Sequence, residues 1–149
     1  MKKNSRQDGF TIIELLLVLV VVLVLAAIVA ASFSSIRKRE NNKERRSDIM
    51  LIQSNLENYY VKHTMYPTLD EVNNQKWRDE NFKQISTDVL TDPTGSSDEL
   101  TNKPAGGSYS YQVTGSDGKS CDNTKTICTE YTLTATLEGG GTFTRNNIN

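Results

Sequence analysis

The sequence contains few of the residues that interrupt helices or build catalytic and metal sites. Its 149 residues include two cysteines, three prolines, one tryptophan and one histidine, His63. No glycine lies between Phe10 and Thr94, and no proline precedes Pro67. One histidine and two cysteines cannot supply a structural zinc site, and His63 has no evident nucleophile with which to act in catalysis. No glycine-rich phosphate loop occurs either. We therefore expect no enzymatic activity.

The chain also lacks a strong net charge. The formal net charge is -1 at pH 7, so composition gives no general reason to expect nucleic-acid binding. The distribution is uneven, however, because residues 37–48 carry six basic and three acidic side chains. Such a run could contact nucleic acid or anionic lipid. The interleaved acidic residues favour a solvated helix face instead.

One long apolar run stands near the N-terminus. Residues 12–31 number twenty, and Glu14 is the only polar residue among them. In a helix they would span about 30 Å, the thickness of a bilayer core. A charge in such a segment costs roughly 2.5–3.5 kcal/mol on insertion scales, so Glu14 indicates a specific partner. The alternative is a cleaved secretory signal, which has a shorter apolar core and a small-residue cleavage site such as residues 30–32 could form.

The helical pattern continues beyond the apolar run. With no glycine or proline to end it, we predict one helix from about Phe10 to about His63, some 54 residues or roughly 80 Å long. Thr64 to Pro67 would end it, because proline disfavours helical geometry in the residue before it. A single stripe marks the second half at three- and four-residue steps: Ile49, Ile52, Leu56, Tyr59 or Tyr60, and His63. A domain must cover this stripe.

Three later segments alternate like half-buried strands, residues 108–114, 131–137 and 142–144. Three antiparallel strands need a cover on their apolar face, and the stripe of the long helix is available. Residues 92–95, Asp-Pro-Thr-Gly, predict a turn. Short helical turns are expected before it, with these core residues: Leu69, Val72, Trp77, Phe82, Ile85, Val89 and Leu90.

The predicted fold class is therefore α+β, with a long N-terminal helix packed on a small antiparallel sheet. Residues 10–31 would form the membrane-spanning or filament-core half of the helix, residues 32–63 its amphipathic continuation, and residues 64–149 the globular head. Cys121 and Cys128 are the only cysteines, with six residues between them. With an export segment upstream we expect a disulfide; two free thiols are the alternative.

The junction of residues 8–14, Asp-Gly-Phe-Thr-Ile-Ile-Glu, resembles the class III leader junction of type IV pilins and pseudopilins. The end of the predicted helix, with the Tyr66-Pro67 pair after it, looks like the end of the pilin helix. Asp92-Pro93 and the two predicted strands before Glu138, at residues 109–111 and 131–133, look like the sheet of pseudopilin-like subunits. The resemblance implies that residues 1–9 are a leader peptide. A prepilin peptidase would cleave between Gly9 and Phe10 and N-methylate Phe10.

The resemblance implies a structural subunit of a type IV pilus-like filament, either a major or minor pilin or a pseudopilin. Its partners would be identical or related subunits, the prepilin peptidase, an inner-membrane assembly platform and, before assembly, membrane lipid. The chain would cross the cytoplasmic membrane once with its head outside the cytoplasm, and then enter a filament. Two alternatives stay open: a pseudopilin of a type II secretion or DNA-uptake system, and a single-span membrane protein whose head binds a ligand.

Glu14 and Phe10 are the expected assembly residues. Cleavage would free an amine at Phe10, and that cation could meet Glu14 in a dry environment. Along a straight helix Glu14 cannot easily reach the amine of its own chain, whereas a subunit displaced along the filament axis could supply one. The hypothesis is that this pair sets the register of a filament. The alternative is a tolerated charge that reaches the membrane interface.

No cofactor is expected, with one weak exception. Asp117-Gly118 and Asp122 resemble the Asp-rich turn where some pseudopilins bind calcium. A full set of oxygen ligands at recognisable spacing is missing from this region. Ordinary turn chemistry is therefore the favoured interpretation of Asp117 and Asp122.

Overall fold

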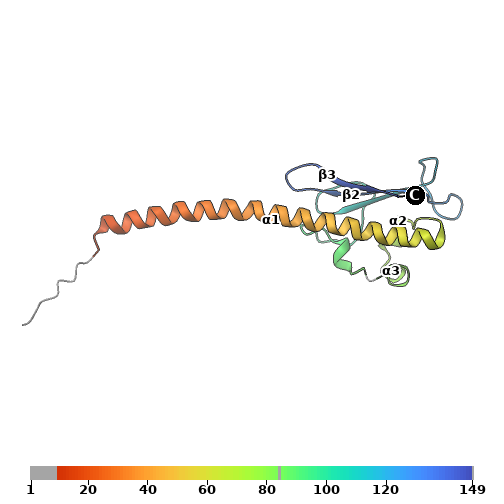
Figure 1. Ribbon diagram of the computed structural model, residues 1–149, viewed down its shortest axis with the longest axis horizontal. Coiled ribbons are helices and arrows are strands. Elements are labelled where there is room, and N and C mark those ends of the chain that lie inside the picture. Colours follow the sequence, from red (N-terminus) through yellow and green to blue (C-terminus); the bar gives the residue numbers. More distant parts are fainter. Residues whose placement is uncertain (1–9, 84, 149) are drawn as a thin grey trace, which may run out of the picture. The chain divides into compact units, whose positions relative to one another are not determined.

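The computed structural model describes residues 10–83 and 85–148, without the side chains of residues 31 and 32 (Figure 1). The elements follow one another in this order: α1 (Ile12–His63), α2 (Leu69–Asn73), α3 (Gln75–Asn81), the 3-10 helix η1 (Thr87–Leu90), β1 (Tyr109–Thr114), β2 (Glu130–Thr136) and β3 (Thr142–Asn146). The predicted α+β class and the long helix are confirmed, and α1 has 52 residues. The chain divides into two compact units between Arg37 and Lys38, which are described separately.

The first unit is the apolar part of α1. Its described side chains are exposed on every side of the helix, from Val21 at 48 % to Ile12 at 83 %. A helix that is apolar all round is typical of a membrane span or of the core of a larger body. This segment therefore has the composition of a buried helix, although its described side chains are exposed in the single chain.

The second unit is an α+β head built on the rest of α1. The predicted stripe is buried along most of its length, with Ile49, Ile52 and Leu56 fully covered. Figure 1 shows β2 and β3 on one side of this part of α1 and α3 on the other. Aromatic residues extend the core towards the helix end, where Tyr66 packs edge-on against Tyr131 with ring centroids 4.7 Å apart.

The sheet is antiparallel, with strand order β1-β2-β3. The three predicted strands are confirmed, with ends shifted by one or two residues. One face packs on α1 through a row of buried side chains: Tyr109, Tyr111, Tyr131, Leu133 and Ala135. The opposite face carries the alternate residues, which are almost all hydroxyl and amide side chains.

The segment between α1 and the sheet contains a capping box and a turn that its local sequence encodes. A capping box begins α2, in which Glu71 N donates to Thr68 Oγ1 and Thr68 N donates to Glu71 Oε2. The predicted turn is confirmed by a 2.8 Å bond from Gly95 N to Asp92 O. All seven predicted core residues lie in the hydrophobic core or pack against it: Leu69, Val72, Trp77, Phe82, Ile85, Val89 and Leu90.

Candidate functional site

Glu14 lies in the first turn of α1 and has a partner in its own chain. The backbone N–H and the hydroxyl of Thr11 both donate to Glu14 Oε2, each at 2.9 Å. In return, Glu14 N donates to Thr11 Oγ1 at 3.3 Å. These reciprocal bonds form a capping box, which satisfies helix N–H groups that have no partner within the helix. The sequence contains the matching signal, Thr-x-x-Glu before an apolar run. The expectation that Glu14 cannot easily fold back towards the N-terminus of its own chain is therefore wrong, because its carboxylate reaches Thr11 N, one residue after Phe10.

The capping box uses only one oxygen of the carboxylate. Oε1 of Glu14 accepts no hydrogen bond from residues 10–83 or 85–148. No Lys, Arg or His occurs in residues 10–36, so no basic side chain of that stretch balances the charge of Glu14. Because an ionised carboxylate has about four acceptor positions, the capped Glu14 can still bind a cation.

The predicted cleavage junction is described on one side only. Phe10 is exposed over 88 % of its surface. Gly9 and the predicted leader, residues 1–9, lie outside the described residues. Length and composition make α1 the one helix among those described that could cross a membrane. Phe10, Thr11 and Glu14 therefore lie at the start of a candidate span.

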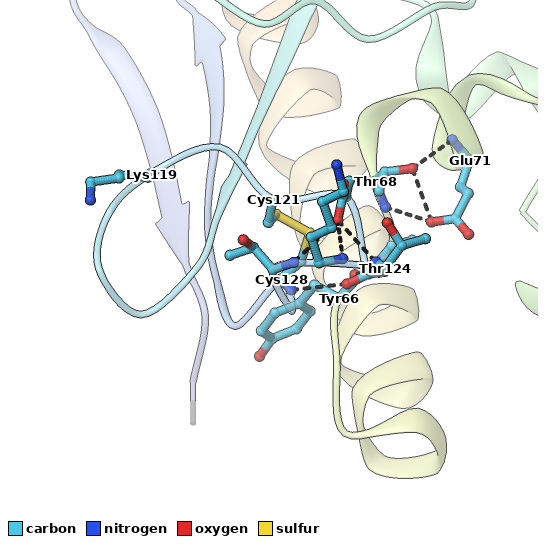
Figure 2. Close-up of a disulfide and its surroundings, with 12 residues drawn as sticks. Tyr66, Thr68, Glu71, Lys119, Cys121, Thr124 and Cys128 are labelled. Atoms are coloured by element: carbon cyan, nitrogen blue, oxygen red, sulfur yellow. Dashed lines mark hydrogen bonds between the residues drawn. A yellow bond between two sulfur atoms is a disulfide. The ribbon is translucent and has the colours of Figure 1, made fainter.

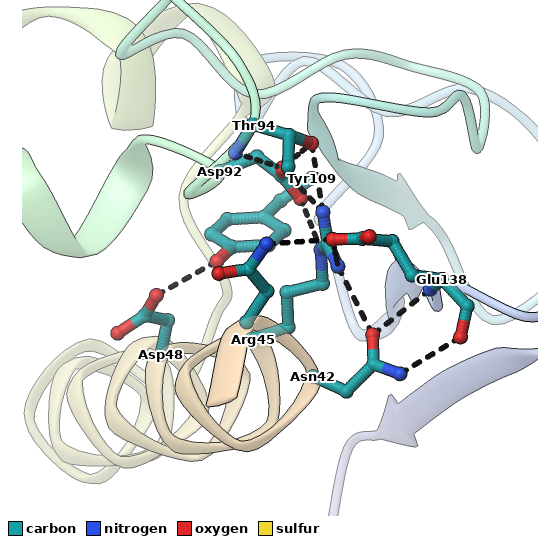
Figure 3. A network of polar contacts seen from close by, with 8 residues as sticks. Asn42, Arg45, Asp48, Asp92, Thr94, Tyr109 and Glu138 are labelled. Carbon is teal, nitrogen blue, oxygen red and sulfur yellow. Dashed lines mark hydrogen bonds and ion pairs between the residues drawn. The ribbon is translucent and has the colours of Figure 1, made fainter. Parts of the chain in front are cut away.

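A buried ion-pair network joins α1 to two distant parts of the head (Figure 3). Arg45 Nε lies 2.6 Å from Asp92 Oδ2, and Arg45 Nη2 lies 2.8 Å from Asp92 Oδ1. The expectation of a solvated basic face is wrong for Arg45, which is 1 % exposed. Burial alone would raise the pKa of Asp92, but the hydrogen bonds from Arg45 and Thr94 outweigh it and hold that pKa below its usual value. The local sequence could not predict that Arg45 pairs with Asp92, because the two residues are 47 positions apart.

The same network holds the connection after β2. Arg45 Nη1 donates to Glu138 Oε1 at 3.2 Å. Asn42 bonds the backbone of Glu138 in both directions, each at 2.9 Å, and Asn41 donates to Glu138 Oε1 at 2.7 Å. One turn of α1 therefore holds the β2–β3 connection through four hydrogen bonds between Glu138 and the side chains of Asn41, Asn42 and Arg45.

The predicted disulfide between Cys121 and Cys128 is confirmed (Figure 2). Its loop is tied to the chain that follows α1. Tyr66 N donates to Cys128 O at 2.8 Å, and Asn123 Nδ2 donates to Tyr66 O at 2.8 Å. Asn123 Oδ1 also accepts from Cys128 N at 2.9 Å. The disulfide therefore stabilises a loop that is hydrogen-bonded to the segment directly after α1.

The calcium candidates lie in turns of this region. Asp122 Oδ1 accepts from the backbone N–H groups of Thr124, Lys125 and Thr126 at 2.9, 2.7 and 3.2 Å. These bonds, that of Lys125 first, lower the pKa of Asp122 to about 2. Asp117 accepts from Lys119 N at 3.1 Å. Across the described chain, no group of three or more His, Cys, Asp or Glu side chains could hold a metal ion. The expectation of ordinary turn chemistry at Asp117 and Asp122, with calcium as the weak alternative, stays a prediction.

Comparison with protein-family models matches residues 4–30 to the prokaryotic N-terminal methylation motif. With the apolar half of α1 and the α+β head, this match defines a protein with a prepilin-type N-terminal segment. Such a segment is characteristic of type IV pilins and pseudopilins, so the predicted family resemblance is confirmed. It also indicates membrane anchoring. Comparisons with curated proteins and with solved structures find no significant match.

Proposed function

We propose that this chain is a structural subunit of a type IV pilus-like filament. The observation that carries the proposal is the methylation motif at residues 4–30. The described part of that motif is a helix, apolar all round, with a single carboxylate in its first turn. Such a helix can serve as a membrane anchor before assembly and as a core element of a helical bundle afterwards. The head would then be carried on the outside of that bundle.

Processing would prepare the first turn for assembly. Prepilin peptidase would cleave between Gly9 and Phe10 and N-methylate Phe10. The new amine would lie one residue before the capping residue Thr11, where its positive charge opposes the helix macrodipole. A carboxylate in the first turn compensates this charge, and the unused Oε1 of Glu14 can accept from the Phe10 amine of a neighbouring subunit.

Apolar packing alone would not specify this contact. Lipid tails are as apolar as leucine, so moving α1 from a bilayer into a helical bundle has little hydrophobic driving force. An ion pair in a dry environment is directional and strongly penalised when it is not formed. The Glu14–Phe10 pair would therefore set the register, while the leucine and valine side chains supply complementary packing.

Mass spectrometry of the mature N-terminus tests the proposal. The full chain, expressed with a prepilin peptidase, should begin at N-methylated Phe10. A Gly9→Leu variant serves as the control and should keep its leader. A wild-type chain with an intact Met1 would contradict the proposal and favour a single-span ligand-binding protein. A start near Ser32 would indicate a cleaved secretory signal instead.

A second measurement is needed to identify the system to which the filament belongs. Deletion of the chain from its host, followed by assays of surface filaments, protein secretion and DNA uptake, distinguishes a pilus from the two pseudopilin systems. Loss of surface filaments is the result that the proposal expects. Unchanged filaments with a defect in secretion or DNA uptake would assign the subunit to that system instead.

A further inference from the structure

The face of the sheet that points away from α1 is polar and nearly uncharged. Strand alternation places the even-numbered residues of β1 and β2 on this face, because Tyr111, Tyr131 and Leu133 are buried against the helix. The register aligns these residues in rows across the strands. One row joins Gln112, Thr132 and Asn146; two adjacent rows are Ser110, Thr134 and Thr144, and Thr114 with Glu130.

Two of these rows line a hollow at one end of the face. Its volume is about 390 Å³, which lies in the range of small-molecule sites, about 300–1,000 Å³. Five polar side chains on the outer face line it: Gln112, Thr114, Glu130, Thr132 and Asn146. Neighbouring strands are about 4.8 Å apart and successive rows about 7 Å apart, so these groups form a grid that a small ring-shaped ligand can cover.

The hollow is also lined by Tyr131 and Asn147, which bond within the fold, but the five outer-face side chains keep their hydrogen-bonding capacity free within the described chain. No side-chain atom of the five residues makes a hydrogen bond with another residue in the described parts of the chain. Two amides, two hydroxyls and one carboxylate together offer several donors and more acceptors. The surrounding head contrasts with this, since Asn42, Asn55 and Asn73 all bond within the fold.

The chemistry of the lining selects the class of ligand. No lysine or arginine lines the hollow, so phosphate or nucleic acid would meet a carboxylate without a balancing cation. A lone carboxylate cannot supply the six to eight oxygen ligands that calcium takes. Extended peptides pair with sheet edges rather than with faces. A ligand with many neutral hydroxyl groups, each both donor and acceptor, fits the remaining requirement.

We propose that the outer face of the sheet binds a neutral saccharide at Gln112, Thr132 and Asn146, with Thr114 and Glu130 at its border. The amides of Gln112 and Asn146 lie two strand spacings apart, about 9.6 Å, and bond hydroxyl groups at opposite ends of the saccharide, while Thr132 lies between them in the same row. The Glu130 carboxylate accepts from a further hydroxyl. Exposed hydrogen bonds each contribute little net free energy, so the dissociation constant for one head is about 1 mM or weaker. In a filament, repeated copies of this weak site would bind a glycan surface with avidity.

Binding by the single subunit tests this inference independently of assembly. The full chain in detergent micelles is titrated with lactose, maltose, cellobiose and N,N′-diacetylchitobiose while backbone amide NMR shifts are recorded. At least one disaccharide should shift the amides around Gln112, Thr132 and Asn146. Gln112→Ala and Asn146→Ala should each weaken that binding about five- to tenfold. Asn58→Ala, which removes an exposed amide from α1, is the matched control and should leave the affinity unchanged.

The outcomes are separable. No shift with any of the four disaccharides would overturn the inference and leave the proposed filament function untouched. Shifts confined to the disulfide loop would also overturn it, since they would place the site elsewhere. Equal affinity in the Gln112→Ala, Asn146→Ala and Asn58→Ala variants would do the same. Folding of each variant is checked by the amide spectrum before sugar is added.

Discussion

Arg45 and Asp92 form a two-point ion pair in which both residues are 1 % exposed. The pair joins the middle of α1 to the turn before the sheet, and Arg45 reaches Glu138 beyond β2 as well. Three segments far apart in the sequence therefore depend on one guanidinium. The head is held on α1 by this buried charge cluster as well as by its apolar stripe.

Asp92→Ala should destabilise the head by about 3–5 kcal/mol, because it leaves the Arg45 charge buried with only Glu138 to balance it. Chemical denaturation, followed through Trp77 fluorescence, measures the change. The Arg45→Met/Asp92→Leu double variant should be less destabilised than either single one, since no unpaired charge remains. Lys119→Ala breaks only the 3.4 Å pair with Asp117, in which both side chains are at least half exposed, and should change stability by less than about 1 kcal/mol.

The wild-type protein should lose part of its stability in acid through the same pair. The pKa of Asp92 is lower in the folded state than in the unfolded chain. Its contribution is therefore complete above the unfolded pKa of about 3.9 and is lost as the pH falls through the lower folded value. Unfolding curves between pH 2 and pH 7 measure this loss. Asp92→Asn should flatten it, and an unchanged acid limb in that variant would contradict the assignment.

Asp48→Asn should stabilise the protein at pH 7 and above. Tyr109 donates to Asp48 Oδ2 at 2.7 Å. Burial, with the charges of Glu44 and Asp92, raises the pKa of Asp48 to about 6 even though the Tyr109 bond lowers it. Because the folded pKa of Asp48 is raised, the contribution of Asp48 to stability is most favourable below about pH 4 and is lost as the pH rises through about 6.

Asparagine keeps an acceptor for Tyr109 and removes the charge. The expected gain in unfolding free energy is about 1 kcal/mol at pH 7, allowing for solvent screening of this half-buried carboxylate. At pH 4 the gain should disappear, because Asp48 is then protonated in the folded protein. Denaturant titrations of the wild type and of Asp48→Asn at pH 4 and pH 7 measure this gain in unfolding free energy. A gain that is the same at both would point to packing rather than charge.

Reduction of the disulfide should loosen the end of α1. A bridge that closes a loop of about eight residues stabilises by about 2–3 kcal/mol in the chain-entropy model. Dithiothreitol should lower the denaturation midpoint accordingly and speed hydrogen exchange at the Tyr66 amide, which donates to Cys128 O. The Cys121→Ser/Cys128→Ser variant is the control, and its midpoint should not respond to dithiothreitol.

Glu14 variants can separate helix capping from intersubunit pairing. Glutamine can replace glutamate in a capping box, so Glu14→Gln keeps the bonds to Thr11 and removes the charge. If the Glu14–Phe10 pair sets the filament register, Glu14→Gln and Glu14→Ala should both lower incorporation at least tenfold while cleavage after Gly9 continues. Thr11→Val, which removes the capping hydroxyl and keeps the charge, should reduce incorporation much less.

Filament yield and the mature N-terminus are measured together in each strain. Normal incorporation of Glu14→Gln beside failure of Glu14→Ala would show that capping, and not charge, is required. Loss of cleavage in Glu14→Gln would place the role of Glu14 in processing instead.

Periodic and local signals were sufficient for most of the fold. The stripe from Ile49 to Tyr59 predicted the face of α1 that is buried, because a regular helix repeats every 3.6 residues, but His63 at its end is exposed. Strand alternation gave β1 and β2 to within one residue at each end. The disulfide followed from two cysteines and an export segment. In each case the structural feature depends on a repeated pattern of apolar residues or on residues close together in the sequence.

Long-range polar contacts could not be predicted in the same way. Arg45 lies in a run of charged residues but four positions before Ile49, so helical periodicity places it on the buried stripe, unlike the exposed Arg46. The sequence does not show which residues pair with it. Its partners Asp92 and Glu138 carry no local mark of burial. The capping box of Thr11 and Glu14 differs, since its sequence signal is present and was overlooked. Glu14 was identified from the cost of its charge alone.

The two carboxylate oxygens of Glu14 differ in their contacts: Oε2 accepts both hydrogen bonds from Thr11 in the first turn, whereas Oε1 accepts none from the described residues. In the proposed filament, a chain whose first turn had frayed would lose the orientation of that open oxygen. A chain that kept its leader would lack the amine that a neighbour's Glu14 accepts. In that filament the same carboxylate would require both an intact first turn in its own chain and a cleaved leader in its neighbour.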